Sequence, residues 1–348
     1  MRYRLFGRST GLRVSEIVLG AGNFGTGWGH GAEPAEARSI LERYIEAGGN
    51  FIDTSDSYQG GQSESLLGGF LKSSRDELIV ASKFTQGVDP SVGLSRSGNS
   101  RKAMVYSVEQ SLKRLQTDRI DLYWVHMPDG MTPVDEIMRG LDDLVRTGKI
   151  LYIGLSDFPA WRVARAATLA EIRGWTSVAG LQIEYSLVER TSDRELIPMA
   201  EAFGLGTVGW SPLGGGVLTG KYRRGEGGRE KAFGGRLFHA ENTPAKSAIL
   251  DVTEEIANER GVTSSQVAIS WVSTRGVMPI IGPRTPEQLE DNLGAIGLTL
   301  SAEHIARLNE VSAVPLGFPH EILSTEGMIQ RLAGGKANEL ERPVVPVL

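Results

Sequence analysis

The sequence predicts an α/β fold: a (β/α)8 barrel, in which eight parallel strands close on themselves and helices lie outside. Short β-rich runs alternate with longer segments of helical apolar spacing, which is typical of βαβ units and a parallel sheet. Eight such runs, most followed by a helix, fit a closed barrel better than an open sheet. The 348 residues suit one barrel, and no repeat or composition break interrupts them. We expect a single domain over 1–348, with the barrel at about 16–311 and a tail at 312–348.

The candidate strands are eight short apolar runs. In chain order they are 17–20, 51–53, 78–82, 120–126, 150–156, 181–184, 207–210 and 278–281. Between them lie segments with apolar residues at helical spacing, several opened by Pro or by a Ser, Thr or Asp cap. The predicted helices include 34–47, 101–116, 133–146, 160–172, 193–203 and 263–272.

Some segments fall outside this alternation. Residues 3–6 and 12–15 flank a Gly/Ser/Thr turn, so we expect them to pair as a hairpin that plugs the far end of the barrel. Three stretches rich in Gly, Ser or Pro, at 85–100, 213–242 and 312–348, are too long for simple connections. Each is a candidate lid, cofactor strap or pocket wall.

Composition argues against several kinds of partner. The 37 Lys and Arg against 42 acidic residues give a formal charge of -5, which provides no general attraction to nucleic acid or to an anionic membrane. The absence of cysteine excludes thiolate chemistry and suits a reducing compartment, so redox chemistry would need a bound cofactor. The start of the chain has no apolar stretch of signal-peptide type, and no apolar run approaches the ~20 residues of a membrane span. We expect a cytoplasmic protein.

A glycine pattern at 20–25 follows the first strand and fits the G-x-G-x-x-G of a Rossmann dinucleotide site, with Asp53 as the candidate ribose-binding acid. Its context does not match that site. Residues 26–31 separate the glycines from a helix that begins near Pro34, whereas Rossmann glycines open the helix directly. Asp53 also lies beyond the expected ~20 residues. We favour a loop that passes close to a ligand over the barrel mouth.

Four polar residues lie at or just beyond the ends of strands two, three and four: Asp53, Tyr58, Lys83 and His126. Each alone is ordinary, because charged residues beyond strands are mostly solvated and buried Tyr or His is mostly structural. Their occurrence together at the ends of three successive strands is more informative, since barrel active sites are built at the C-terminal ends of the strands. The sequence therefore predicts that the four side chains meet.

This grouping suits the reduction of a carbonyl group. Hydride addition leaves an oxyanion that must be protonated, and a phenol with a pKa of ~10 is a poor acid unless that value is lowered. The cation of Lys83 can lower the pKa of Tyr58, and Asp53 can hold that cation. His126 can donate to the carbonyl oxygen and orient it, and its imidazole can assist proton transfer in the reverse reaction.

The segments around these residues resemble the signatures of the aldo-keto reductase family in order and spacing. The matching segments are 49–58, 63–64, 81–84 and 121–126. The resemblance spans roughly 4–311 and implies an NADP(H)-dependent oxidoreductase that reduces an aldehyde or ketone to an alcohol, or the reverse. It implies Tyr58 as general acid/base, Lys83 and Asp53 as its modulators, and His126 as the residue that orients the substrate.

The nicotinamide site is implied by two further segments. Residues 154–158 resemble the family's G-[VIL]-S-N-F element, whose Ser and Asn bind the carboxamide together with a Gln on the next strand; these positions are Ser156, Asp157 and Gln182. Asp157 departs from the pattern, because an ionised acid can accept from the carboxamide but cannot donate to its oxygen. Residues 210–221 resemble a second element, in which the aromatic residue stacks on the nicotinamide and the backbone and the Lys reach the pyrophosphate. Its candidate residues are Trp210, Ser211, Leu213, Gly216 and Lys221.

The adenosine end is implied by 279–292, which resemble the family's site for the 2'-phosphate. Arg284 is the candidate partner of the phosphate near a helix N-terminus, with Gln288 and Asn292 one and two turns along the same face and Gly282 just before. The resemblance therefore implies NADP(H). If Arg284 is only a surface charge, NAD(H) would serve comparably.

The substrate is less defined, and two other functions stay open. Trp28, Phe84 and Met127, with Asp129, are candidate walls for a medium-sized aldehyde or ketone, either an aryl aldehyde or a keto sugar. One alternative is a cofactor-binding regulatory subunit with little turnover. The other is a metal-dependent hydrolase or lyase, against which the presence of only five His without paired metal-ligand spacing argues.

Overall fold

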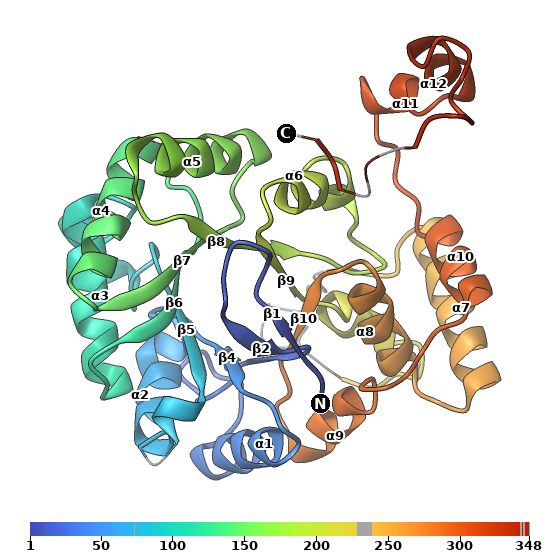
Figure 1. Cartoon of the computed structure of the whole chain (residues 1–348). Coiled ribbons are helices and arrows are strands. Elements are labelled where there is room, and N and C mark those ends of the chain that lie inside the picture. Colours follow the sequence, from blue (N-terminus) through green and yellow to red (C-terminus); the bar gives the residue numbers. More distant parts are fainter. Residues whose placement is uncertain (73, 228–238, 342, 344, 348) are drawn as a thin grey trace.

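The structure, a computed structural model, describes residues 1–72, 74–227, 239–341, 343 and 345–347. Eight parallel strands form a closed barrel in the order β10-β3-β4-β5-β6-β7-β8-β9, with helices around it (Figure 1). The strands are β3 (Val18–Gly20), β4 (Phe51–Asp53), β5 (Ile79–Phe84), β6 (Ile120–Val125), β7 (Ile150–Ser156), β8 (Val178–Glu184), β9 (Gly206–Trp210) and β10 (Met278–Ile281). The predicted fold class is confirmed.

Twelve α-helices are seen in the described residues. They are α1 (Pro34–Glu46), α2 (Gln62–Phe70), α3 (Arg101–Leu115), α4 (Val134–Arg146), α5 (Ala160–Arg173), α6 (Leu196–Ala202), α7 (Pro244–Arg260), α8 (Ser264–Thr274), α9 (Pro286–Leu293), α10 (Ala302–Val311), α11 (His320–Leu323) and α12 (Glu326–Leu332). Six of these helices were not among those predicted from apolar spacing: α2, α7, α9, α10, α11 and α12. Helix α2 contains two adjacent glycines, Gly68 and Gly69. One of those glycines serves packing: a Cβ on Gly68 would lie 2.3 Å from the carbonyl oxygen of Arg114, at the end of α3.

The predicted N-terminal hairpin is present. Strands β1 (Tyr3–Leu5) and β2 (Arg13–Ser15) pair antiparallel, in front of the barrel in Figure 1. Phe6, which follows β1, is fully buried and packs edge-on against Phe51 inside the barrel, with ring centroids 5.7 Å apart. Gly206 of β9 leaves room for this plug, because a Cβ there would lie 2.7 Å from the Phe6 ring. Apolar contacts therefore close this end of the barrel.

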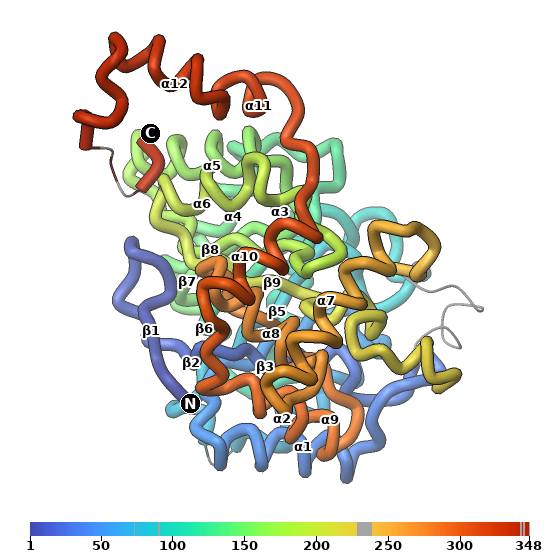
Figure 2. The backbone as a smooth tube through the Cα atoms, turned by 90° about the vertical axis from the view of Figure 1, so that its right-hand side faces the viewer, coloured from blue at the N-terminus to red at the C-terminus, as the bar shows by residue number. Residues whose placement is uncertain are grey.

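The C-terminal tail does not lie over the barrel mouth. Figure 2 shows α11 and α12 standing off the body, toward the end that carries the hairpin. Pro346 and Val347 return to a small pocket formed with α5 and α6. The prediction of a lid or strap at 312–348 is therefore corrected for the described residues of the tail. None of the described helices combines the length and the apolar character needed to cross a membrane.

Candidate active site

A cavity of about 1140 Å³ opens at the C-terminal ends of the strands. Asp53, Tyr58 and His126 line it at one end, and Arg284 lines it near the start of α9. Every predicted cofactor residue except Ser156 also lines this cavity; they are Asp157, Gln182, Trp210, Ser211, Leu213, Gly216, Lys221, Gly282, Arg284, Gln288 and Asn292. The structure thus brings residues from both halves of the chain to one elongated site.

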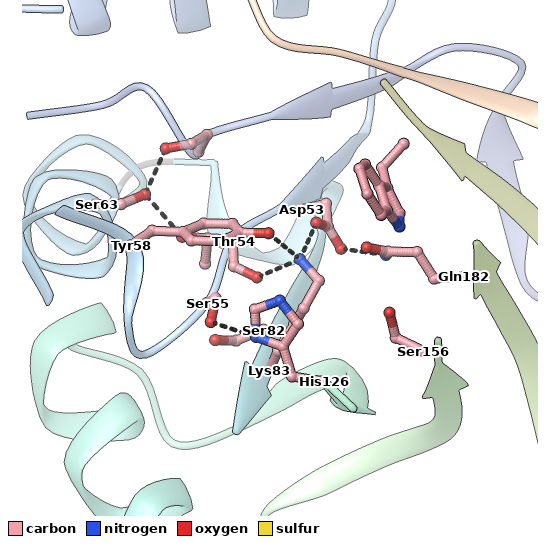
Figure 3. A network of polar contacts seen from close by, with 12 residues as sticks. Asp53, Thr54, Ser55, Tyr58, Ser63, Ser82, Lys83, His126, Ser156 and Gln182 are labelled. Atoms are coloured by element: carbon pink, nitrogen blue, oxygen red, sulfur yellow. Dashed lines mark hydrogen bonds and ion pairs between the residues drawn. The ribbon is translucent and has the colours of Figure 1, made fainter. Parts of the chain in front are cut away.

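Lys83 lies at the centre of the polar cluster at the first end (Figure 3). Its side chain is fully buried, and its Nζ donates to Asp53 Oδ1 and to Tyr58 Oη, the latter at 3.1 Å. It also donates to the carbonyl oxygen of Thr54 at 3.0 Å. The second carboxylate oxygen of Asp53 accepts from Gln182 Nε2 at 3.0 Å. Because every ammonium hydrogen has an acceptor, the cation is held at a fixed place beside the phenol.

Burial shifts the pKa values of Tyr58 and Lys83, so this cluster does not behave like an exposed cation–phenol pair. Burial raises the pKa of Tyr58, and the Lys83 ammonium opposes that rise without overcoming it. Burial alone would lower the pKa of Lys83, but the Asp53 carboxylate and Tyr58 raise it above its ordinary value. The expectation of a net lowered pKa for Tyr58 is therefore corrected. At neutral pH the phenol keeps its proton and the ammonium keeps its charge.

His126 completes the predicted tetrad at the same place. Its ring packs edge-on against Tyr58 with centroids 5.7 Å apart, and its Nδ1 lies 3.2 Å from Ser55 Oγ. Burial, and then the nearby Lys83 charge, lower the pKa of His126 to about 3. The imidazole is therefore neutral under ordinary conditions, with one nitrogen able to donate and the other able to accept.

The Asp157 carboxylate accepts a hydrogen bond from Trp210, which the sequence did not predict. The backbone φ of Asp157 is +56°, in the left-handed region that Asp and Asn adopt more often than most other residues except Gly. Trp210 Nε1 donates to its Oδ1 at 3.1 Å, and Ser156 Oγ donates to its Oδ2 at 3.3 Å. Burial raises the pKa of Asp157 to about 6, although these hydrogen bonds oppose the rise. The acid therefore fixes the orientation of the indole at the cavity wall.

The other end of the cavity combines glycines with basic side chains. Gly215 and Gly216 have φ values of +67° and +98°, and a Cβ on Gly216 would lie 3.0 Å from Lys221 Nζ. Arg223, Arg224 and Arg284 line the same cavity. At the start of α9, the backbone N–H of Arg284 donates to Gln288 Oε1 at 2.9 Å. A narrow backbone surface beside cations suits a ligand with phosphate groups.

The sequence also did not predict the ion pairs that hold the segment after Lys221. Arg223 pairs with Glu241 at 2.6 Å and with Asp251 of α7 at 2.7 Å. These ion pairs hold the chain after Lys221 against α7. Part of 213–242 thus forms a cavity wall as predicted, while its residues 228–238 lie outside the described residues.

Two of the three predicted substrate residues lie at the cavity. Trp28 and Met127 line it, and the Trp28 ring meets Tyr58 edge-on at 6.0 Å. Phe84 does not line it: its ring is fully buried and stacks on Tyr123 at 5.2 Å, so that prediction is corrected. Because successive strand residues face opposite sides, the inward position of Lys83 turns Phe84 toward the helices.

The loops near Phe84 also contribute less to the cavity wall than the sequence predicted. Asp129 accepts hydrogen bonds from the backbone N–H groups of Asn99 and Thr132, so its carboxylate shapes the loop. Neither Asp129 nor any described residue of 85–100 lines the cavity. The predicted walls in this part of the chain are therefore corrected.

Known proteins are similar to the chain over nearly its whole length. The profile of the Aldo/keto reductase family matches residues 16–313. A norsolorinic acid reductase of Aspergillus flavus is 35% identical over 332 residues, which cover 92% of this chain and 84% of that protein. An aryl-alcohol dehydrogenase of Pestalotiopsis microspora is 34% identical, with 94% and 87% covered. The uncharacterized oxidoreductase YrpG of Bacillus subtilis is 36% identical, with 91% and 98% covered.

Proposed function

The chain belongs to the aldo/keto reductase family, and on that premise we propose that it is an NADP(H)-dependent oxidoreductase that interconverts an aldehyde or ketone and an alcohol. One observation carries the proposal. Lys83 Nζ lies between Asp53 and the Tyr58 hydroxyl, in the cavity that continues to Arg284. A phenol, its cationic partner and several basic side chains thus line or adjoin one cavity, which supports the proposal.

The residues at the cavity fit a dinucleotide in extended form. Asp157, Gln182 and Trp210 would hold the nicotinamide, which supplies or accepts the hydride when bound. Ser156 does not line the cavity, and its hydroxyl would act through its hydrogen bond to Asp157. Ser211, Leu213, Gly216 and Lys221 would hold the pyrophosphate, because the bare glycine backbone and the lysine cation meet there. Gly282, Arg284, Gln288 and Asn292 would hold the adenosine and its 2'-phosphate at the start of α9.

The protein's own groups handle the proton. The Tyr58 hydroxyl donates its proton to the substrate oxygen as negative charge develops there, and takes it back in the oxidation direction. Lys83 stabilises the phenolate that remains, and Asp53 keeps Lys83 in position. His126 donates a hydrogen bond that orients the substrate oxygen. Since burial keeps the phenol protonated, the cation beside it matters most after the proton has left.

We infer that the substrate is an aryl aldehyde or an aryl ketone. Trp28, Met127 and Trp210 give the cavity a flat and apolar wall, and two relatives are named norsolorinic acid reductase and aryl-alcohol dehydrogenase. Steady-state NADPH oxidation with aryl aldehydes, aliphatic aldehydes and keto sugars tests it. We expect aryl aldehydes to have the highest kcat/KM. NADPH binding without turnover of any carbonyl would instead support the regulatory subunit.

Asp157 makes cofactor affinity depend on pH. Since the pKa of its carboxyl is raised by burial to about 6, the protonated group below that pH can donate to the carboxamide oxygen and the ionised group above it cannot. We expect the Kd of NADPH to rise as pH increases through about 6 in the wild type. Asp157→Asn should bind NADPH more tightly at neutral pH, because its amide donates at every pH.

Fluorescence titration of both proteins with NADPH checks this expectation. The 2'-phosphate itself titrates with a pKa of roughly 6, but it does so equally for the two proteins, so the difference between their profiles isolates Asp157. Trp210 should keep its partner in the variant, since the amide oxygen still accepts. Parallel pH profiles with equal Kd values would contradict the assigned role of Asp157.

A further inference from the structure

A buried chain of polar groups runs from His126 away from the cavity. Ser55 Oγ lies 3.2 Å from His126 Nδ1, 3.3 Å from Asp56 Oδ1 and 3.1 Å from Ser57 Oγ. It also accepts from the Ser57 backbone N–H at 3.3 Å. Ser55 is fully buried and Asp56 is 2% exposed. The function proposed above uses neither residue.

The Ser55 hydroxyl has a single proton to share among these neighbours. When Asp56 is ionised, its carboxylate is the strongest acceptor, since hydrogen bonds to charged groups are about twice as strong as neutral ones. The contact with His126 then requires Nδ1 to donate to Ser55 Oγ, which leaves Nε2 without a proton. When Asp56 is protonated, the Ser55 proton is available to His126 Nδ1, and Nε2 carries the hydrogen.

The pKa of Asp56 depends on burial and on charged or polar groups from three elements packed around it. Burial, and then the negative charge of Glu64 on α2, raise the pKa of Asp56 to about 7 against the opposing effect of Arg114 on α3. Tyr123 of β6 also faces Asp56, and Lys83 of β5 faces His126. Glu64 is itself paired with Arg114 at 2.7 Å. Both charge states of Asp56 are therefore accessible near neutral pH.

We propose that Asp56, acting through the Ser55 hydroxyl, selects which ring nitrogen of His126 carries the proton. Asp56 is then a positioning residue for the hydrogen bond that His126 makes in the cavity. Figure 3 shows that the ring nitrogen not joined to Ser55 lies on the side of Tyr58 and Lys83. This is the nitrogen that meets a ligand.

The consequence for catalysis rests on the proposed function, whereas the tautomer is a property of the protein alone. A hydrogen on Nε2 matches a carbonyl oxygen, which only accepts. An Nε2 without a hydrogen can accept a hydrogen bond from the hydroxyl group of an alcohol. Protonated Asp56 therefore favours binding of the carbonyl compound, and ionised Asp56 favours binding of the alcohol.

Nuclear magnetic resonance of the full chain with isotope-labelled histidine tests the proposal. The two neutral tautomers differ in the nitrogen chemical shifts of the imidazole, and His126→Gln identifies the signal of His126. Between roughly pH 5 and 8, we expect the wild type to change from hydrogen on Nε2 to hydrogen on Nδ1, with a midpoint near the Asp56 pKa of about 7. Ser55→Ala and Asp56→Asn should each lose this change.

Ser57→Ala is the matched control, because it removes a neighbouring buried hydroxyl that contacts Ser55 while leaving Asp56 and His126 in place. It should keep the transition. A wild-type His126 tautomer that stays constant over this range, or a transition that survives in Ser55→Ala, would overturn the proposal. The signal is read without substrate or turnover, so failure of this inference and failure of the proposed function are separate results.

Discussion

Tyr58→Phe should lower kcat for carbonyl reduction by about 100-fold or more, the size expected when a general acid is lost. The phenol is the buried group that carries a dissociable proton beside Lys83 at the cavity, and phenylalanine keeps the ring while removing that proton. The Kd of NADPH should stay nearly unchanged, because the proposed cofactor contacts come from other residues. Steady-state kinetics and fluorescence titration of the same preparation separate the two effects.

Tyr3→Phe is the matched control for this variant. Tyr3 is 59% exposed in β1 of the hairpin, and its hydroxyl donates to the carbonyl oxygen of Gly48, which precedes β4 at the opposite end of the barrel. The same chemical change there should leave kcat and Kd as in the wild type. Undiminished turnover in Tyr58→Phe would remove Tyr58 from the mechanism, whatever the cofactor.

Arg284→Ala should separate the two cofactors. A charge-assisted hydrogen bond contributes roughly 1.5–3 kcal/mol, and about 1.4 kcal/mol is a factor of ten. We therefore expect Kd and KM for NADPH to rise by roughly 10-fold to 100-fold. The values for NADH, which lacks the phosphate, should change little.

Parallel measurements with both cofactors make this test specific. Arg4→Ala, an exposed arginine of the hairpin, is the control for loss of one positive charge far from the cavity. If Arg284→Ala weakens NADPH and NADH equally, Arg284 does not recognise the 2'-phosphate. The choice between the two cofactors would then depend on another part of the site.

Most strand ends were predictable because hydrophobic runs and the residues that follow them are local features. The exceptions are β5, which was expected to end at 82 and continues to Phe84, and β6, which ends one residue before the predicted 126. Asp53, Lys83 and His126 each follow such a run, and parallel strands bring their C-terminal ends to one face of the barrel. The position of Phe84 was predictable from the same alternation that places Lys83 inward.

Contacts between distant segments were not predictable in the same way. Gln182 donates to Asp53 across 129 positions, and Trp210 donates to Asp157 across 53. Neither pair follows from spacing, because both depend on how the barrel closes. The link from Ser55 to His126 is of this kind too, and it requires the loop after β4 to fold back beneath the imidazole.

The direction of the Tyr58 pKa shift also could not be predicted from the sequence. Pairing alone suggested that Lys83 lowers the pKa of Tyr58, but the depth of burial decides the net direction, and burial raises it. Depth of burial depends on the hairpin, the loops and the helices together. The tail poses a similar problem, because its composition does not indicate at which end of the barrel it packs.

We propose that this site moves hydride between the nicotinamide of NADPH and a carbonyl carbon, with Tyr58 supplying the proton. Reduction of an aryl aldehyde with NADPH deuterated at both positions of the nicotinamide C4 tests it most directly. We expect the wild type to yield an alcohol with one deuterium on the carbinol carbon, and Tyr58→Phe to yield almost none of that alcohol. An alcohol without deuterium, or equal deuterium transfer by the two proteins, would contradict it.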